Sequence, residues 1–183
     1  MVPFLYSCSW RTETPPFCSH TQKSWLGRSG ALTAGLRTLG SFSLSVVSQG
    51  VELALSEEKD LMGHAPLWRR EVLMSIDGIP CVLARSVTLL RASHGCWQGM
   101  RKLGRRPLAD LLYHDPGIAR SVFEVSRIGR HHGLYQSLIR TGIESTIDSA
   151  LFARRSVFWR QNQPLMVSEC FLPTFWKLAT PGY

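Results

Sequence analysis

The sequence contains no apolar run long enough to cross a membrane. Its uninterrupted apolar stretches span only a few residues, as at 81–84, whereas a membrane-spanning helix needs roughly 20. Segment 1–8 has no basic residue, and its apolar run is too short for a secretory signal. We therefore expect a cytoplasmic protein without a transmembrane segment.

Patterns that mark common metal and nucleotide sites are also missing. The sequence has neither the Gly-x-Gly-x-x-Gly nor the Walker motif of nucleotide-binding proteins. No Cys-x-x-Cys pair is present, so neither a disulfide framework nor a zinc site is predicted. No serine or cysteine stands in a recognisable nucleophile context. The five cysteines are widely spread, at Cys8, Cys18, Cys81, Cys96 and Cys170.

Lysine is scarce, although the chain is basic. Only four of the 21 basic residues are lysines, and the net charge is +8. Such a charge favours an anionic partner, and the planar guanidinium of arginine matches carboxylate and phosphate. Genome composition can produce the same excess of arginine, so both interpretations stay open. The basic cluster at 101–106 has little aromatic interleaving, and we expect a solvated face there.

The 183 residues, 44% hydrophobic and 19% charged, fit one domain. We assign 24–176 to this domain, 1–23 to a loosely ordered leader and 177–183 to a tail. Strands joined by hairpins, with helices between them, predict an α+β fold with an antiparallel sheet. Periodicity predicts strands at 42–46, 51–55, 67–76, 79–90, 121–128, 156–160 and 165–172, with a turn at 48–50 between the first two. It predicts helices at 25–39, 94–103, 108–113 and 134–151.

The Asp77-Gly78 pair predicts a two-residue hairpin turn. An uninterrupted register would place Arg70 directly opposite Arg85, on a face that is otherwise apolar. Like charges placed opposite each other are destabilising, and an unpaired buried charge is costly. The two arginines therefore need either protein carboxylates or an anionic ligand, and the pattern leaves both open.

Glu169 is a single carboxylate within an apolar strand, where it shares a face with Val167 and Phe171. Glutamate is almost never fully buried unless it is paired. One interpretation is a salt bridge to an arginine inside the sheet. The other is a carboxylate in a dry pocket that accepts a hydrogen bond or moves a proton. His131 and His132, without further ligands at zinc spacing, are expected on the surface.

Several short segments, in order along the chain, resemble the bacterial chorismate lyase (chorismate pyruvate-lyase) family. They are Trp-Arg-Arg-Glu-Val-Leu (68–73) with Asp-Gly-x-Pro (77–80) and Ala-Arg-Ser (84–86), Leu-Gly-Arg-Arg-Pro-Leu (103–108) with Leu-Leu-Tyr (111–113), Leu-Phe-Ala-Arg-Arg-Ser (151–156), Ser-Glu-Cys-Phe-Leu-Pro (168–173) and an early Ala-Leu-Thr (31–33).

The resemblance implies a fold and a reaction. The expected fold is an antiparallel sheet of about six strands with helical flaps over a buried site, related to ligand-sensing domains of transcription regulators. The expected reaction converts chorismate to 4-hydroxybenzoate and pyruvate, the first step of ubiquinone biosynthesis, without a metal or cofactor. The resemblance also implies roles for residues of this sequence. Arg70 would bind the ring carboxylate, and Glu169 would contact the 4-hydroxyl end of the ring. The backbones of Leu32 and Leu108 would complete the hydrogen bonds, and Arg85 would be the second cation.

Two other classes of function remain open. A non-catalytic module of the sensor fold would bind the aromatic acid without releasing pyruvate, and a nucleic-acid binder would show steep salt dependence of binding.

The sequence departs from the family at one place. Segment 134–150 looks like an insertion, which we expect at the surface; the alternatives are a helix over the site, an oligomer contact or a membrane-surface element. We expect a monomer with, at most, weak association with an anionic membrane surface.

Overall fold

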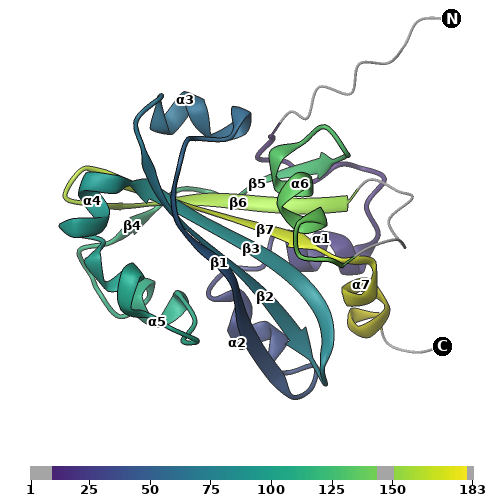
Figure 1. Cartoon of the computed structure of the whole chain (residues 1–183). Coiled ribbons are helices and arrows are strands. Elements are labelled where there is room, and N and C mark those ends of the chain that lie inside the picture. The colour runs from purple at the N-terminus through teal and green to yellow at the C-terminus, as the bar shows by residue number, and fades with distance from the viewer. Residues whose placement is uncertain (1–9, 144–150, 181–183) are drawn as a thin grey trace, which may run out of the picture.

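The computed structural model describes residues 10–143 and 151–180, which are arranged around one curved antiparallel sheet (Figure 1). Its strand order is β1-β2-β3-β7-β6-β4, and β5 also pairs with β6. The expected α+β fold is confirmed, with a seven-stranded sheet. The strands are β1 (Phe42–Glu52), β2 (Leu67–Ile76), β3 (Ile79–Leu89), β4 (Ala119–Arg120), β5 (Glu124–Ile128), β6 (Leu151–Arg160) and β7 (Gln163–Phe171).

The helices are short and lie between and beside the strands (Figure 1). None of those in the described part of the chain is long and apolar enough to cross a membrane. They are α1 (His20–Leu26), α2 (Leu32–Leu36), α3 (Lys59–Met62), α4 (Leu90–His94), α5 (Ala109–Leu112), α6 (Gly133–Ile139) and α7 (Pro173–Ala179), with 3₁₀ turns at Ser56–Glu58 and Gln98–Lys102.

Two tight hairpins organise the long strands. Asp77 and Gly78 both have positive φ, 49° and 78°, as a two-residue turn that follows the twist of its strands requires. Gln161 and Asn162 adopt the same region between β6 and β7, with φ of 49° and 57°. These turns hold β2 beside β3 and β6 beside β7, and the β3–β7 pairing joins the two hairpins.

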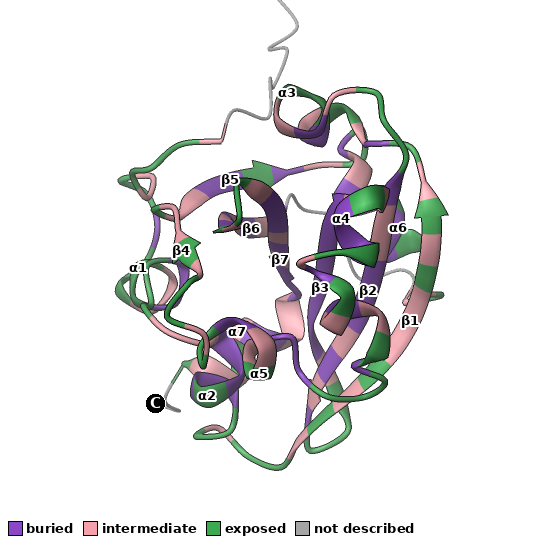
Figure 2. Ribbon diagram, turned by 90° about the vertical axis from the view of Figure 1, so that its left-hand side faces the viewer, coloured by how far each residue is buried: buried purple, intermediate pink, exposed green. Residues whose placement is uncertain are grey.

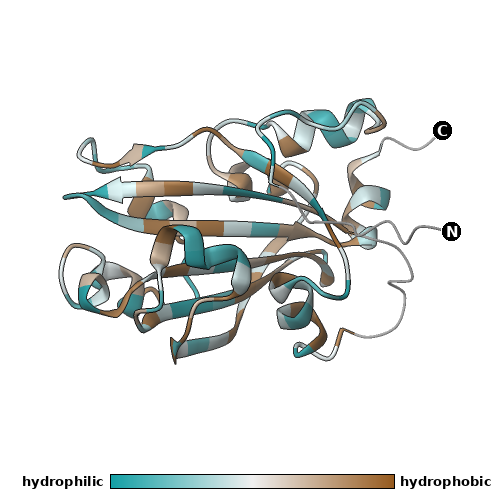
Figure 3. Ribbon diagram, turned by 90° about the horizontal axis from the view of Figure 1, so that it is seen from above, coloured by the Kyte–Doolittle hydropathy of each residue, from teal (hydrophilic) through white to brown (hydrophobic). Residues whose placement is uncertain are grey.

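Alternation along the strands separates two faces of the sheet. Hydrophobic and hydrophilic stretches both occur along the strands (Figure 3). The central strands carry consecutive apolar residues, as at 72–74 and 81–84, because successive side chains point to opposite faces and both faces are covered. One face carries Val72, Met74 and Phe171 and packs against α1, α2 and α7. The other carries Leu83 and Cys170 and packs against α6. Buried residues run along β7, β3 and β2, whereas β1 lies at the edge and is more exposed (Figure 2).

The prediction of a turn at 48–50 was wrong. Strand β1 continues through this segment, and Ser48, Gln49 and Gly50 pair with Glu71, Arg70 and Arg69 of β2. A register irregularity between Val46 and Ser48 takes the place of the turn. The strand therefore bends by a β-bulge, in which an extra residue leaves pairing intact on both sides.

The expected leader boundary at residue 24 falls inside helix α1. A capping box starts this helix, since the Gln22 amide donates to Ser19 Oγ and the Ser19 amide donates to Gln22 Oε1, at 3.1 and 2.9 Å. Upstream, Arg11 exchanges two backbone hydrogen bonds with Val125. The Ser-x-x-Gln signal was readable in the sequence, and it places ordered structure before residue 24.

The segment expected as a surface insertion contributes to the core. Helix α6 ends at Ile139, and its side chains Leu134, Tyr135 and Leu138 are buried on the face of the sheet that carries Leu83. The expected helix over 134–151 is therefore too long, because Leu151 already begins β6. Residues 144–150 of that prediction lie outside the described residues.

The expectation of a surface position was also wrong for His132, which is buried beside α6. Its Nδ1 lies 2.9 Å from Glu57 Oε1, and the ring of Trp10 meets it edge-on, with the centroids 5.7 Å apart. His131 is exposed, as expected. The buried position of His132 depends on Glu57, 75 residues earlier in the numbering, so local sequence could not indicate it.

Candidate active site

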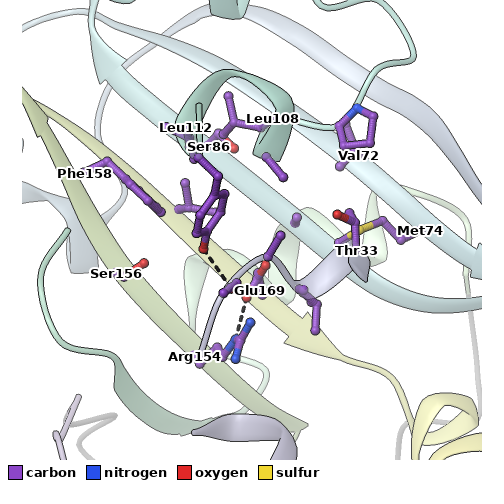
Figure 4. Close-up of a pocket in the computed structure, with 18 of the residues that line it drawn as sticks. Thr33, Val72, Met74, Ser86, Leu108, Leu112, Arg154, Ser156, Phe158 and Glu169 are labelled. Carbon is purple, nitrogen blue, oxygen red and sulfur yellow. Dashed lines mark hydrogen bonds and ion pairs between the residues drawn. The ribbon is translucent and has the colours of Figure 1, made fainter. Parts of the chain in front are cut away.

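A pocket lies between the α1/α2 face of the sheet and two loops that close over it. We call residues 28–36, which include α2, flap 1, and residues 104–113, which include α5, flap 2. Figure 4 shows Thr33 of flap 1 and Leu108 and Leu112 of flap 2 around the pocket, with Arg154 and Glu169 on the strands. Strand residues of the lining are Leu44, Arg70, Val72, Met74, Ala84, Ser86, Arg154, Ser156, Phe158, Val167 and Glu169.

The lining is mostly apolar, with a few polar groups at defined places. Apolar side chains from β2, β6, β7 and both flaps form most of its wall. The charged members are Arg70, Arg154 and Glu169. The hydroxyl groups of Ser86 and Ser156, on residues that are themselves buried, also line it. A pocket of this kind suits a small, largely apolar ligand that carries negative charge.

Arg70 is the pocket cation without a carboxylate partner among the described residues. Its side chain comes from the middle of β2, and the residue is only 1% exposed. Nη2 donates to the carbonyl oxygens of Gly104 and Arg106, at 2.9 and 3.0 Å, and Nε has no acceptor in the described structure. Burial lowers the pKa of Arg70, but a guanidinium stays charged in proteins. Arg70 therefore presents an uncompensated positive charge to the pocket.

Glu169 and Arg154 form an ion pair within the sheet. They are direct cross-strand partners on β7 and β6, and Arg154 Nε donates to Glu169 Oε2 at 2.6 Å (Figure 4). The Glu169 side chain keeps 14% of its exposure. The expected salt bridge to an arginine inside the sheet is therefore present, and Glu169 also lines the pocket.

Arg154 also fixes the position of flap 1. Its Nη1 donates at 2.9 Å to the carbonyl oxygen of Arg28, the first residue of flap 1, and at 3.0 Å to that of Trp25 in α1. Its guanidinium lies 4.2 Å from the ring centroid of Phe123. Arg70 holds flap 2 in the same manner through Gly104 and Arg106. Each flap is thus anchored to the sheet by one arginine that lines the pocket.

Leu32 and Leu108 lie in the two flaps and line the pocket, as expected. Leu32 is the first residue of α2, and Leu108 is the N-cap of α5. The amide groups at such positions have no acceptor inside their own helix. Both backbones can therefore donate to a ligand in the pocket.

The prediction that Arg85 faces Arg70 was wrong. Cys81 has no partner in the β2–β3 ladder, so the register shifts by one residue, and Arg85 lies opposite Glu71 while Arg70 lies opposite Ser86. A shift of one residue moves a side chain to the other face of the sheet. Arg85 is therefore absent from the pocket lining, and the expectation of a second cation at this position is corrected.

Arg85 instead belongs to a buried ionic network behind the pocket. Its Nε donates to Glu58 at 2.6 Å, its Nη1 donates to Glu71 at 2.9 Å, and it also pairs with Glu52. Burial acts to lower the pKa of Arg85, but Glu58 and Glu52 raise it overall. Arg85 thus satisfies protein carboxylates, which was the first of the two alternatives that the sequence left open.

Sequence reasoning missed Arg154, although a signal for it existed. In a two-residue hairpin the numbers of paired residues have a constant sum, and the turn at Gln161-Asn162 pairs Arg160 with Gln163 and hence Arg154 with Glu169. The same sum does not hold along the Asp77-Gly78 hairpin, because an irregularity shifts its register. The pocket therefore holds a second cation, supplied by β6.

The described residues hold no group of three or more His, Cys, Asp or Glu side chains placed to bind a metal ion. Cys81 and Cys170 are completely buried, and burial raises the pKa of both thiols. Raised pKa values disfavour the reactive thiolate. The charged groups that line the pocket are Arg70, Arg154 and Glu169.

Solved structures of low sequence identity share the fold. The effector domain of PhnF from Mycobacterium smegmatis matches with a TM-score of 0.51 and 13% identity, over 79% of this chain and 90% of that chain. Intact PhnF from the same organism matches with a TM-score of 0.53 and 12% identity, over 80% of this chain and 65% of that one. At this level of identity the two matches concern the fold alone.

Similarity in sequence is much higher to curated bacterial proteins. A probable chorismate pyruvate-lyase of Bordetella pertussis is 51% identical over 181 residues, which cover 97% of this chain and 95% of that protein. Probable chorismate pyruvate-lyase 1 of Burkholderia pseudomallei is 36% identical over 174 residues, 93% of each chain. The family model for chorismate lyase matches residues 6–180. With this match across the pocket and both flaps, the chain belongs to the chorismate lyase family.

Proposed function

We propose that the protein cleaves chorismate to 4-hydroxybenzoate and pyruvate, and so supplies the aromatic acid for ubiquinone biosynthesis. The observation that carries the proposal is the placement of charge in the pocket. Arg70 is a buried cation without a carboxylate partner among the described residues, and Glu169 is a carboxylate fixed by Arg154 in the same apolar cavity. Family membership and the names of the relatives support the same reaction.

Arg70 would bind the ring carboxylate of the substrate. A bidentate guanidinium–carboxylate contact in a dry site is strong and directional, and it would compensate the charge of Arg70. The amides of Leu32 and Leu108 would add hydrogen bonds from the two flaps. Glu169 would accept a hydrogen bond from the 4-hydroxyl group at the other end of the ring.

Chorismate has a second carboxylate, on the enolpyruvyl group that leaves. Because Arg85 lies behind the sheet, we assign the second cation to Arg154, which lines the pocket from β6. Breaking the ether bond at ring carbon 3 develops negative charge on the enolpyruvyl oxygen, and loss of a proton from carbon 4 makes the ring aromatic. The proton lost from carbon 4 is balanced by the one that converts the enolpyruvyl fragment into pyruvate. Aromatisation drives the reaction, and the protein contributes a held reactive conformer and stabilisation of the developing charge.

The same geometry suits a lyase that releases its product slowly. 4-Hydroxybenzoate is planar and keeps the carboxylate and hydroxyl groups that Arg70 and Glu169 would bind. Both flaps would have to separate before it leaves, so flap opening would limit turnover. We further propose a cytoplasmic monomer that does not bind nucleic acid and makes, at most, weak contact with anionic membrane surfaces.

The proposal is tested by mixing the purified protein with chorismate in EDTA. Ultraviolet absorbance follows 4-hydroxybenzoate, and a coupled reductase assay follows pyruvate. We expect both products in equal amounts. In Arg70→Met or Glu169→Gln we expect kcat/KM to fall by about 100-fold, since truncating one partner of a buried charged contact costs ~2–5 kcal/mol.

Arg91→Met, which removes an exposed arginine, is the matched control and should retain the wild-type rate. Saturable binding of 4-hydroxybenzoate without release of pyruvate would refute the lyase and favour a non-catalytic sensor of the same fold. Activity that EDTA abolishes would contradict a metal-independent reaction.

A further inference from the structure

Each flap is tied to the sheet by an arginine, but one side chain ties the flaps to each other. The hydroxyl of Tyr113, at the end of flap 2, donates a hydrogen bond of 2.8 Å to the carbonyl oxygen of Gly30 in flap 1. Among the described residues, no other hydrogen bond connects the two flaps. Tyr113 and Gly30 both line the pocket, so this bond closes a ring of protein around it.

The tyrosine ring is held in place independently of its hydroxyl group. It caps the C-terminus of α5 and meets the ring of Phe158 edge-on, with the centroids 6.1 Å apart. Burial raises the pKa of Tyr113, which keeps the hydroxyl protonated and able to donate. Removing only the hydroxyl would therefore break the connection between the flaps while the ring keeps its packing.

A second hydrogen bond orients this hydroxyl. Arg120 of β4 donates to the Tyr113 oxygen through Nη1 at 3.1 Å. Its guanidinium also lies 4.4 Å from the ring centroid of Phe123, whose ring lies 4.2 Å from the guanidinium of Arg154. The hydroxyl thus accepts one hydrogen bond and donates another, which fixes its direction toward Gly30.

The acceptor stands at a specialised backbone position. Gly30 has φ of +78°, and a Cβ built there would meet nothing within 4 Å. Glycine is therefore favoured at this position by the left-handed backbone conformation and not by a lack of space for a side chain. This conformation sets the direction of the peptide that carries the carbonyl group.

We propose that Tyr113 is a latch between the flaps, a positioning residue that sets how long the aromatic product stays in the pocket. The proposal deepens the lyase function and rests on it. With product bound, the flaps are held by the Arg70 and Arg154 anchors and by this bond. Breaking the bond lets flap 1 and flap 2 separate, and 4-hydroxybenzoate leaves between them.

The test compares wild type with Tyr113→Phe. Stopped-flow measurements give the association and dissociation rate constants of 4-hydroxybenzoate. We expect dissociation to become about threefold to tenfold faster, the size of effect expected from the loss of one neutral hydrogen bond. Association should become faster as well, because the same bond holds the flaps together in the ligand-free protein, so the dissociation rate constant is the deciding quantity.

Hydrogen exchange of the ligand-free protein tests the latch without any ligand. We expect faster exchange in segments 28–33 and 108–113 of Tyr113→Phe, with unchanged exchange in β2 and β3. The control, Thr180→Val, removes another hydroxyl-to-carbonyl bond of 2.8 Å, from Thr180 to Trp176, outside the pocket. It should leave both the product kinetics and the exchange of the flaps as in wild type.

The outcomes separate the latch from the proposed function. Faster exchange in the flaps together with faster product release supports the latch. Unchanged exchange in the flaps, or unchanged product dissociation in a protein that binds 4-hydroxybenzoate, overturns it. If wild type does not bind 4-hydroxybenzoate, the proposed product-retention role fails, while the exchange data still decide whether Tyr113 connects the flaps.

Discussion

Arg70 and Arg85 are buried to the same extent, at 1% exposure each, yet their partners give them different roles. Arg70 contacts two backbone carbonyl groups and no carboxylate of the described residues. Arg85 contacts three carboxylates behind the sheet, those of Glu52, Glu58 and Glu71. The positive charge of Arg70 is therefore available to an anionic ligand, whereas the charge of Arg85 is neutralised by carboxylates of the protein.

At the residue scale, we expect Arg85→Met to affect stability and Arg70→Met to affect binding. Removing Arg85 leaves buried carboxylates without their cation, and breaking a buried ion pair in this way costs ~3–5 kcal/mol of unfolding free energy. Arg70→Met should cost less stability, because no carboxylate loses its partner. It should nevertheless weaken 4-hydroxybenzoate binding more than Arg85→Met does.

Urea denaturation and titration with 4-hydroxybenzoate on both variants measure these two effects. The interpretation fails if Arg70→Met is the more destabilised variant, or if Arg85→Met weakens product binding as strongly as Arg70→Met.

At the scale of elements, the β2–β3 hairpin determines which arginine reaches the pocket. A hydrogen bond attaches its turn to the segment before β1, because Asp77 Oδ1 accepts from the Ser41 amide at 2.8 Å. Next to the turn, Ser75 pairs with Pro80 and Met74 pairs with Val82, so that Cys81 is the extra residue. This one-residue irregularity places Arg70 and Arg85 on opposite faces of the sheet.

Gly78→Ala tests the turn itself. Gly78 has φ of +78°, and an added Cβ would meet nothing within 4 Å, so the cost is the backbone conformation alone. We expect the unfolding free energy to fall by ~1–2 kcal/mol, the cost of a left-handed conformation for a residue with a Cβ. Gly50→Ala is the matched control, because Gly50 also has space around it but has no positive φ.

Denaturant titration of the two variants separates backbone strain from contacts. Equal destabilisation by both substitutions would show that the positive φ at Gly78 is not what the turn requires.

At the scale of the whole molecule, Glu57 joins segments that are far apart in the sequence. Its Oε1 accepts hydrogen bonds from the Leu134 amide at the start of α6 and from His132. Its backbone carbonyl accepts from Arg155 of β6, whose guanidinium lies 4.5 Å from the ring centroid of Trp10. This cluster attaches the segment after β1, helix α6 and the N-terminal segment to the sheet.

The cluster predicts a defined loss of stability in acid. Burial acts to raise the pKa of Glu57, but the hydrogen bond and the charge of His132 outweigh it and lower the pKa from 4.5 to about 2. Because the folded pKa lies below the unfolded one, the stabilisation is fully present above about pH 4.5 and is lost as the pH falls toward 2.

We therefore expect the difference in unfolding free energy between wild type and Glu57→Gln to shrink steadily between pH 5 and pH 2.5. Urea titrations of both proteins at several pH values measure this difference. Because both proteins contain the other carboxylates, their contribution to the pH dependence cancels in the difference. A difference that stays constant over this range would contradict the assignment.

The sequence by itself determined the features that depend on local pattern. The Asp77-Gly78 turn, the strands around it and the sharing of one face by Val167, Glu169 and Phe171 follow from turn chemistry and alternation. The family motifs also indicated Arg70, Leu32, Leu108 and Glu169, and all four line one pocket. Strand period and hairpin turns are properties of neighbouring residues, which is why they were readable.

Only the tertiary structure decided the partners of Arg85, His132 and Tyr113. Arg85 lies outside the predicted site because of a one-residue irregularity at Cys81. Its carboxylate partners come from three separate segments. His132 is buried because Glu57 and Trp10 reach it from elsewhere in the chain. The bond between Tyr113 and Gly30 spans 83 positions. Ion pairs and hydrogen bonds depend on distances of a few ångström, and these are set by strand register and packing rather than by local pattern.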